Sequence, residues 1–144
     1  MCKKVLVAMS GGVDSSVALL LLKQKGYDCA GVMMNLFESD INACGSLNEA
    51  KYASDVAASM GVPFQIYDFT PDFDKRVIRH FVDAYINGVT PNPCIECNRF
   101  LKFGALFSCV QKFGLDFFAT GHYARIEFDH KSNRFLLKKA LDES

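Results

Sequence analysis

The heptapeptide Ser10-Gly11-Gly12-Val13-Asp14-Ser15-Ser16 decides the fold of this chain. Residues 4–9 before it form an almost uninterrupted apolar run, which is typical of a parallel strand buried on both faces. Residues 13–25 place apolar side chains at helical spacing, and Gly26 follows them as a stop signal. The heptapeptide is therefore predicted to be a tight turn from a buried strand into a helix.

The rest of the chain continues to alternate between strands and helices. Three further strands are predicted from the apolar runs at residues 29–34, 64–69 and 117–120. Helices are predicted at residues 47–60, 70–88 and about 99–112, and a β-hairpin at residues 123–128 and 134–139. The helix that starts near residue 70 is expected to bury a stripe of Phe73, Val77, Ile78, Phe81, Val82 and Tyr85. This order indicates an α/β fold: a doubly wound parallel sheet with helices on both faces and ligands at the carboxyl ends of its strands.

Composition and charge narrow the function classes. The chain has 144 residues, half of them hydrophobic, and its 16 Lys and Arg balance its 16 Asp and Glu. A net charge of zero gives no general attraction to nucleic acid, so any RNA contact must come from local patches. No apolar run is long enough to span a membrane, and a cytoplasmic location is expected. The six cysteines are irregularly spaced, which favours reduced thiols over a disulfide framework.

The chemistry of the heptapeptide points to a phosphate. Gly11 and Gly12 let the backbone turn tightly and approach a ligand, and the free amides of the following helix then face an anion. The hydroxyls of Ser10, Ser15 and Ser16 are candidate donors. Asp14 would repel a phosphate directly, so it is expected to help hold Mg²⁺. Neither a Walker A loop nor a dinucleotide fingerprint is present, because the first needs a lysine and the second a third glycine.

Two further strings carry chemistry. The first is Thr90-Pro91-Asn92-Pro93-Cys94-Ile95-Glu96-Cys97-Asn98, predicted to be a proline-stiffened loop with Cys97 just before a helix, where the dipole favours a thiolate. Its Cys-x-x-Cys pair has three interpretations: reduced thiols with Cys97 acting, a redox pair, or two ligands of a metal or iron–sulfur centre that needs more ligands from elsewhere. The second string is Ala119-Thr120-Gly121-His122-Tyr123-Ala124-Arg125, where Gly121 at a strand end lets a ligand come close.

These three strings, in this order, carry a family resemblance. The heptapeptide resembles that of the ATP-pyrophosphatase (PP-loop) superfamily, and the whole chain is similar to the N-terminal part of the bacterial tRNA-specific 2-thiouridylases of the MnmA/TrmU family. The resemblance implies a Rossmann-like sheet of the adenine nucleotide alpha hydrolase type. It implies a transferase that adenylates the C2 oxygen of the wobble uridine of tRNA, releases pyrophosphate, and then installs sulfur from a cysteine persulfide to give 2-thiouridine. It also implies ATP and Mg²⁺ as cofactors, and tRNA and a persulfide-carrying protein as partners, with no membrane partner.

The resemblance also implies roles for individual residues. Cys97 falls on the nucleophile position, and Asp14 is the second residue expected in catalysis. The residues expected to contact ATP are Ala8, Met9, Ser10, Gly11, Gly12, Val13, Asp14, Ser15, Met34 and Gly121. Those expected to contact the target base or tRNA are Asn92, Pro93, Cys94 and His122. Cys94 departs from the family, which usually has aspartate there, and this departure creates the Cys-x-x-Cys pair.

The family's persulfide-bearing cysteine and its tRNA-gripping domains are expected downstream of Ser144. Residues 1–144 are thus expected to form one PP-loop catalytic domain, a fragment of a longer enzyme. Two alternatives stay open: another PP-loop adenylating synthetase, and a non-catalytic nucleotide-binding module of the same fold.

Overall fold

A parallel four-stranded sheet forms the centre of the molecule. The computed structural model describes residues 2–37 and 47–141. The sheet order is β3-β2-β1-β4, and its strands are β1 (Lys4–Ala8), β2 (Asp28–Asn35), β3 (Phe64–Asp68) and β4 (Phe117–Ala119). After β3 the chain crosses back to add β4 on the other side of β1. The strand order therefore reverses beside β1, and the carboxyl end of β1 is where a doubly wound sheet binds its ligand.

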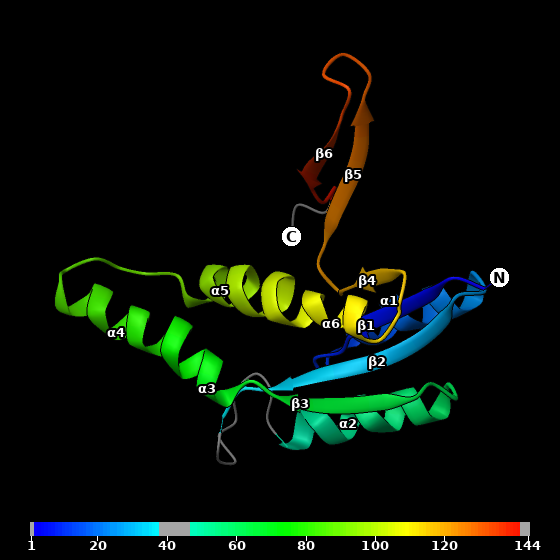
Figure 1. Ribbon diagram of the computed structural model, residues 1–144, viewed down its shortest axis with the longest axis horizontal. Helices are drawn as coiled ribbons and strands as arrows, with labels where there is room; N and C mark the ends of the chain where they lie inside the picture. Colours follow the sequence, from blue (N-terminus) through cyan, green and yellow to red (C-terminus); the bar gives the residue numbers. More distant parts are fainter. Residues whose placement is uncertain (1, 38–46, 142–144) are drawn as a thin grey trace.

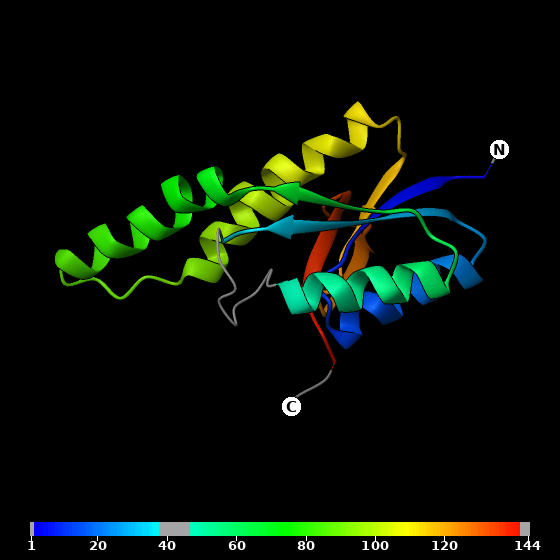
Figure 2. The same cartoon turned by 90° about the horizontal axis from the view of Figure 1, so that it is seen from below.

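Helices cover both faces of the sheet, as Figure 2 shows. One face carries α1 (Val13–Gln24) and α2 (Leu47–Ser59). The second of two long helical rods covers the other face, and the first packs against it and runs past the end of the sheet. In each rod a π-helical segment lies between α-helical ends. The first rod consists of α3 (Thr70–Phe73), η1 (Asp74–Ile78) and α4 (Arg79–Ile86). The second consists of α5 (Pro93–Glu96), η2 (Cys97–Leu106) and α6 (Phe107–Lys112). The doubly wound α/β prediction is confirmed.

Strand β1 shows why this arrangement is stable. Val5 and Val7 pack into the core cluster that contains Leu19 of α1, whereas Leu6 packs into the cluster on the opposite face with Leu101 of η2. Successive side chains of a strand point to opposite faces, so an uninterrupted apolar strand contributes to both cores at once. The apolar run that precedes the heptapeptide therefore sets the two-sided burial of the sheet.

The buried stripe predicted after Pro71 is mostly wrong. Val77 is buried, but Ile78, Val82 and Tyr85 are 38%, 46% and 56% exposed. Figure 1 gives the reason, because α4 extends past the end of the sheet and no strand lies beneath it. The apolar side chains do recur at helical spacing, but this spacing does not show how far the sheet extends beneath the helix.

The predicted start of the second rod is also wrong. The helix begins at Pro93, about six residues before the expected position, and Asn92 caps it by accepting a hydrogen bond from the Cys94 amide at 3.0 Å. Asparagine is a favoured N-cap, and proline suits the first helical position because its φ is already helical. Cys97 therefore lies one turn inside the helix, and Cys94 is the cysteine in its first turn.

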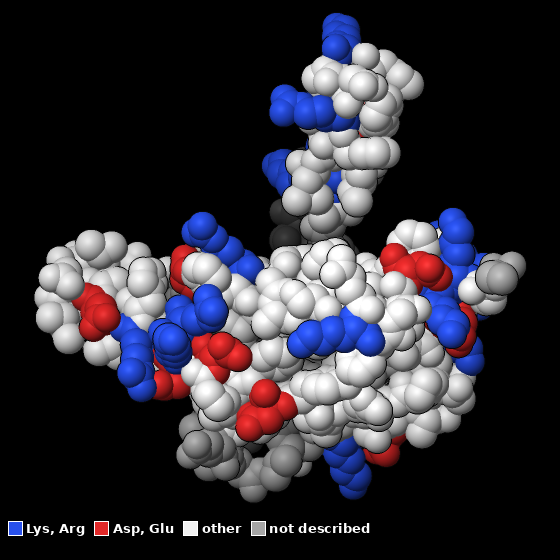
Figure 3. Space-filling model, in the orientation of Figure 1, with Lys and Arg blue, Asp and Glu red and all other residues white. Residues whose placement is uncertain are grey.

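The β-hairpin is confirmed and projects from the body of the molecule (Figure 1). Its strands are β5 (Ala124–Asp129) and β6 (Arg134–Lys139). On the face shown in Figure 3, both charge signs mix over the body, whereas the hairpin presents basic side chains. The basic residues of the hairpin are Arg125, Lys131, Arg134, Lys138 and Lys139.

Within the described ranges, no helix is long and apolar enough to cross a membrane.

Candidate functional site

The phosphate-loop sequence closes into a turn held by its own serines. Gly12 is the N-cap of α1, and Gly11 has a φ of +81°, a left-handed conformation that favours glycine. The Ser15 hydroxyl, which is buried, donates to the Gly12 carbonyl at 3.1 Å and accepts from the Ser10 amide at 3.2 Å. The Ser16 hydroxyl also donates to the Gly12 carbonyl, at 2.9 Å. Ser15 and Ser16 thus hold the loop. Ser10, an exposed residue, accepts from the Gly12 amide at 3.4 Å, and its hydroxyl lies 3.3 Å from that of Ser15.

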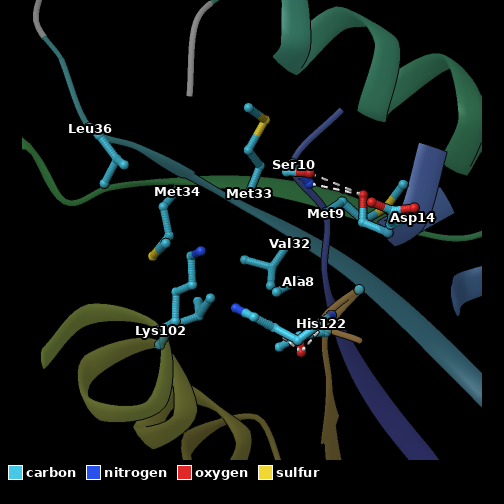
Figure 4. A pocket seen from close by; sticks show the side chains of 14 residues that line it. Ala8, Met9, Ser10, Asp14, Val32, Met33, Met34, Leu36, Lys102 and His122 are labelled. Atoms are coloured by element: carbon cyan, nitrogen blue, oxygen red, sulfur yellow. Dashed lines mark hydrogen bonds between the residues drawn. The ribbon is translucent and has the colours of Figure 1, made fainter. Parts of the chain in front are cut away.

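A pocket opens at the carboxyl end of β1, between the loop and the second helical rod (Figure 4). Most of the residues expected to contact ATP line it: Ala8, Met9, Ser10, Asp14, Ser15, Met34 and Gly121. His122, expected near tRNA, also lines it. Gly11, Gly12 and Val13 belong to the adjoining turn but not to the lining, and Val13 is 77% exposed. Three segments far apart in the chain are therefore brought together here, after β1, at the end of β2 and after β4.

Gly121 is needed for the way these segments meet. A Cβ at this position would lie 2.7 Å from the Ser15 amide nitrogen and 2.9 Å from the Asp14 carbonyl carbon. Only a residue without a side chain lets the segment after β4 pass this close to the start of α1. The close approach expected at Gly121 is thus made by the backbone of the loop itself, which forms one wall of the pocket.

Asp14 has a partner that the sequence analysis did not single out. The Tyr123 hydroxyl donates a hydrogen bond to Asp14 Oδ1 at 2.9 Å and so orients the carboxylate. The carboxylate is exposed and lines the pocket, and Mg²⁺ is commonly bound through one or two carboxylates together with phosphate oxygens. The donor set therefore fits a Mg²⁺ ion that arrives with a nucleotide.

His122 lies at the edge of the same pocket in a fixed orientation. Its Nδ1 is 2.8 Å from Thr120 Oγ1, and its ring packs on Phe103 at 5.6 Å between centroids. Partial burial lowers the pKa of His122, and the nearby positive charge of Lys102 lowers it further. The imidazole is therefore neutral at pH 7 and can accept or donate a hydrogen bond there.

We expect His122 to titrate below pH 6.5, the ordinary value for a histidine. Because the unfolded chain binds this proton more readily, the stability that comes from a neutral His122 is present above pH 6.5 and is lost as the pH falls below it. A two-dimensional NMR titration of the imidazole resonances, assigned with a His122→Gln variant, measures the midpoint. A midpoint at or above the ordinary value would contradict the described environment.

The cysteine segment does not line the pocket. Asn92, Pro93 and Cys94 are outside the lining, and so is Cys97, which is 8% exposed. Cys97 packs in the same core cluster as Leu36 and Leu106, which do line the pocket. The expected placement of Cys97 before a helix start, with a thiolate favoured by the dipole, is thus not what the structure shows.

The Cys-x-x-Cys pair does not by itself fit a metal centre. Cys94 is exposed, Cys97 is buried, and the two are not joined in a disulfide. Within residues 2–37 and 47–141, no group of three or more His, Cys, Asp or Glu side chains is placed to hold an ion. A tetrahedral iron–sulfur or zinc site needs four ligands, and this pair supplies two. Cys44, which the sequence suggests as a further exposed cysteine in the loop after the second strand, lies outside the described residues.

Lys102 is the pocket residue that the sequence analysis missed. It lies on η2, between Met34 and His122 in Figure 4, and its amine points into the pocket. Lys102 and Leu106, four residues apart, both line the pocket, and this spacing puts two residues on one side of a helix.

Together, a doubly wound sheet, a glycine turn after its first strand and a pocket at its carboxyl edge define a nucleotide-binding domain of the PP-loop class. A family model described as "tRNA methyl transferase HUP domain" matches residues 3–144. The chain therefore belongs to the tRNA methyl transferase HUP domain family.

Curated relatives match nearly the whole chain. The chain is 47% identical over 148 residues to the tRNA-specific 2-thiouridylase MnmA of Desulforamulus reducens, with 98% of this chain and 40% of that protein covered. It is also 47% identical to the MnmA of Clostridioides difficile, with 99% of this chain and 41% of that protein covered. The chain thus spans about two fifths of the length of these relatives.

Solved structures support the fold. The U34-tRNA thiolase NcsA from Methanococcus maripaludis, solved with its [4Fe-4S] cluster, superposes with a TM-score of 0.60 at 24% identity, covering 84% of this chain and 38% of that one. A glutamine-dependent NAD+ synthetase from Acinetobacter baumannii, in complex with ADP, superposes with a TM-score of 0.57 at 22% identity, covering 80% and 21%. At these identities the comparison speaks for the architecture alone.

Proposed function

We propose that this chain is the ATP-using catalytic part of a tRNA 2-thiouridylase, and that residues 1–144 form its nucleotide-binding domain. The observation that carries the proposal is the pocket itself, which joins the glycine turn, Met34 and the Gly121-His122 segment. The names of the curated relatives, each a tRNA-specific 2-thiouridylase, support the reaction. The family description mentions methyl transfer, but a phosphate turn beside an acidic residue suits adenylation better than the binding of a methyl donor.

The shape of the pocket suggests how ATP is held. The amides at the start of α1 and the hydroxyl of the exposed Ser10 face the triphosphate, where the helix dipole favours negative charge. Asp14, oriented by Tyr123, holds Mg²⁺ against the phosphate oxygens. The apolar side chains of Val32, Met34 and Leu36 line the remainder and suit the adenine ring.

The first chemical step is an adenylation. The C2 oxygen of the wobble uridine attacks the α-phosphorus of ATP, and the bond from that phosphorus to the bridging oxygen breaks. Pyrophosphate then leaves with the electron pair, and the uridine carries AMP on its C2 oxygen.

The projecting hairpin provides a local positive patch for the tRNA backbone. It carries five basic residues and only two acidic ones, Glu127 and Asp129, although the net charge of the whole chain is zero.

The second step transfers sulfur. The terminal sulfur of a cysteine persulfide bonds to C2, and AMP leaves with the original oxygen. Attack of the Cys97 thiolate on the inner persulfide sulfur releases 2-thiouridine and leaves a disulfide between Cys97 and the carrier cysteine, so the electrons balance. Because Cys97 is 8% exposed, the start of the second rod has to move before the base and the thiol can meet. Asn92, Pro93 and Cys94, which form that start, would then contact the base.

Asp14→Asn is expected to reduce pyrophosphate release by about 10- to 100-fold, because a neutral amide binds Mg²⁺ poorly. The measurement is tRNA-dependent release of pyrophosphate from ATP. Asp116→Asn, at the other end of the sheet, is the matched control and is expected to release pyrophosphate at the normal rate.

Three outcomes separate the alternatives. Undiminished release in Asp14→Asn would show that the glycine turn is not catalytic. Release that depends on a small-molecule acceptor instead of tRNA would favour another adenylating synthetase. ATP binding with no release under any acceptor would favour a non-catalytic nucleotide-binding module.

A further inference from the structure

Lys102 has no assigned role, and its surroundings single it out. Among the residues that line the pocket it is the only one with a permanent positive charge, since His122 is neutral at pH 7. No ion pair within the described part of the chain includes Lys102. The one carboxylate of the lining, Asp14, is engaged by Tyr123. A positive charge directed into a pocket without an acidic partner is a site for an anion.

Lys102 lies in η2, the π-helical part of the second rod. The Phe107 amide donates to the Lys102 carbonyl, five residues back, which is the hydrogen-bond pattern of a π-helix. Gly104 permits the tight contact between turns, because a Cβ there would lie 3.1 Å from the Arg99 carbonyl oxygen. Lys102 and Leu106, one turn apart, both line the pocket, while Leu101 is fully buried behind them. The rod that carries Cys97 thus also supplies the charged wall of the pocket.

Lys102 approaches the pocket from the side opposite the glycine turn. The turn and the start of α1 belong to the helix layer of one sheet face, and η2 belongs to the layer of the other. In Figure 4 the Lys102 amine and the His122 ring both point into the space between these two sides. With the triphosphate at the turn and the adenine against Met34, as proposed above, Lys102 lies on the nucleoside side of the triphosphate, where the first phosphate is the α-phosphate.

We propose that Lys102 binds the α-phosphate of ATP and neutralises the charge on its oxygens as pyrophosphate leaves. This inference rests on the proposed function, since it assumes that ATP occupies the pocket. A lysine acts here as a compact point charge with rotatable donors, which suits phosphate oxygens whose positions change during displacement.

The test compares binding of Mg·ATP, AMP and adenosine to the chain by isothermal titration calorimetry. Lys102→Met keeps the length and apolar stem of the side chain and removes its charge. We expect it to weaken ATP and AMP binding by about tenfold or more, since a charge-assisted hydrogen bond is lost, and to change adenosine binding less than about twofold. Lys112→Met, an exposed lysine in α6 outside the pocket, is the matched control and should bind all three ligands normally.

A second readout checks the geometry without ATP. Lys102→Met is expected to raise the midpoint of His122 in an NMR titration, because the positive charge that lowers its pKa is removed. The groups facing His122 include Thr120 and Phe103 besides Lys102, and neither of them titrates in this range.

The outcomes distinguish failure of this inference from failure of the proposed function. ATP binding unchanged in Lys102→Met, with the His122 midpoint raised, would overturn the role of Lys102 and leave ATP in the pocket. Equal weakening for adenosine and ATP would show a role in shaping the pocket and would also overturn the phosphate contact. Failure of the unsubstituted chain to bind ATP would overturn the proposed function and this inference together.

Discussion

The Gly11→Ala variant is expected to lose about 3 kcal/mol of folding free energy and, with it, the phosphate turn. Two effects combine. Alanine at a φ of +81° is strained by about 1–2 kcal/mol, because its Cβ approaches the following carbonyl. That Cβ would also lie 2.5 Å from the Glu49 carbonyl oxygen and 2.8 Å from the Glu49 Cα, backbone atoms of the first turn of α2. Relief requires α2 or the turn to shift, a rearrangement that typically costs about 1–3 kcal/mol.

Thermal unfolding followed by circular dichroism measures the Gly11→Ala effect, and a fall in Tm of roughly 6–12 °C is expected for a domain of this size. Gly26→Ala is the matched control, since Gly26 has a φ of +80° and nothing within 4 Å of the added Cβ. It isolates the backbone strain, so the difference between the two variants reports the contact with α2. Equal destabilisation by both substitutions would show that α2 does not press on the turn.

The Cys97→Ser variant is expected to form at least about a thousandfold less 2-thiouridine, the largest functional effect predicted. A serine hydroxyl is almost never ionised at neutral pH without a dedicated base, whereas a thiol is a few per cent thiolate and intrinsically very nucleophilic. The measurement is mass analysis of tRNA nucleosides from cells in which a full-length gene that contains this chain carries the substitution. Because Cys97 is buried, the Tm of each variant is recorded alongside.

Cys94→Ser is the informative partner of Cys97→Ser. Cys94 is exposed at the second position of the rod, so this change should leave the fold intact. Normal thiolation in Cys94→Ser would favour two reduced thiols with Cys97 alone in the chemistry. Loss equal to that of Cys97→Ser would favour a working pair, and iron and sulfide analysis of the anaerobic protein would then distinguish a redox pair from a cluster. Normal thiolation in Cys97→Ser would contradict the proposed nucleophile.

The sheet could be predicted from sequence because its strands are unusual. A run such as Val5-Leu6-Val7 is apolar on both sides, and only a parallel strand with helices on both faces buries it completely. The glycine turn followed from the same logic, since the glycines stand between that strand and a helical period. Both features depend on residues next to one another in the sequence, so they can be recognised without knowing which segments pack together in the fold.

The parts that failed depend on information that no local pattern contains. Tyr85 is exposed because the sheet ends before α4 does, which is a property of the strands and not of the helix. The sequence predicts a loop at Pro93, where the structure begins a helix, because proline suits both a stiff loop and a first helical turn. Lys102 was not predicted because the pattern of its own helix does not say which side of that helix faces the pocket.

The pairing of β1 with β4 bears on the order in which the molecule is completed. The Lys4 amide donates to the Asp116 carboxylate at 2.8 Å, and Val5 pairs with Phe117. Strand β1 can pair with β2 early, but its second partner, β4, is synthesised more than a hundred residues after β1. Joining such distant segments has an entropic cost that slows folding. The same pairing brings Gly121 and Tyr123 into contact with the glycine turn. A nucleotide that binds only the finished pocket would select chains in which this closure has occurred and lower the rate at which they reopen. ATP would then stabilise the last folding step of the chain in addition to serving as its substrate.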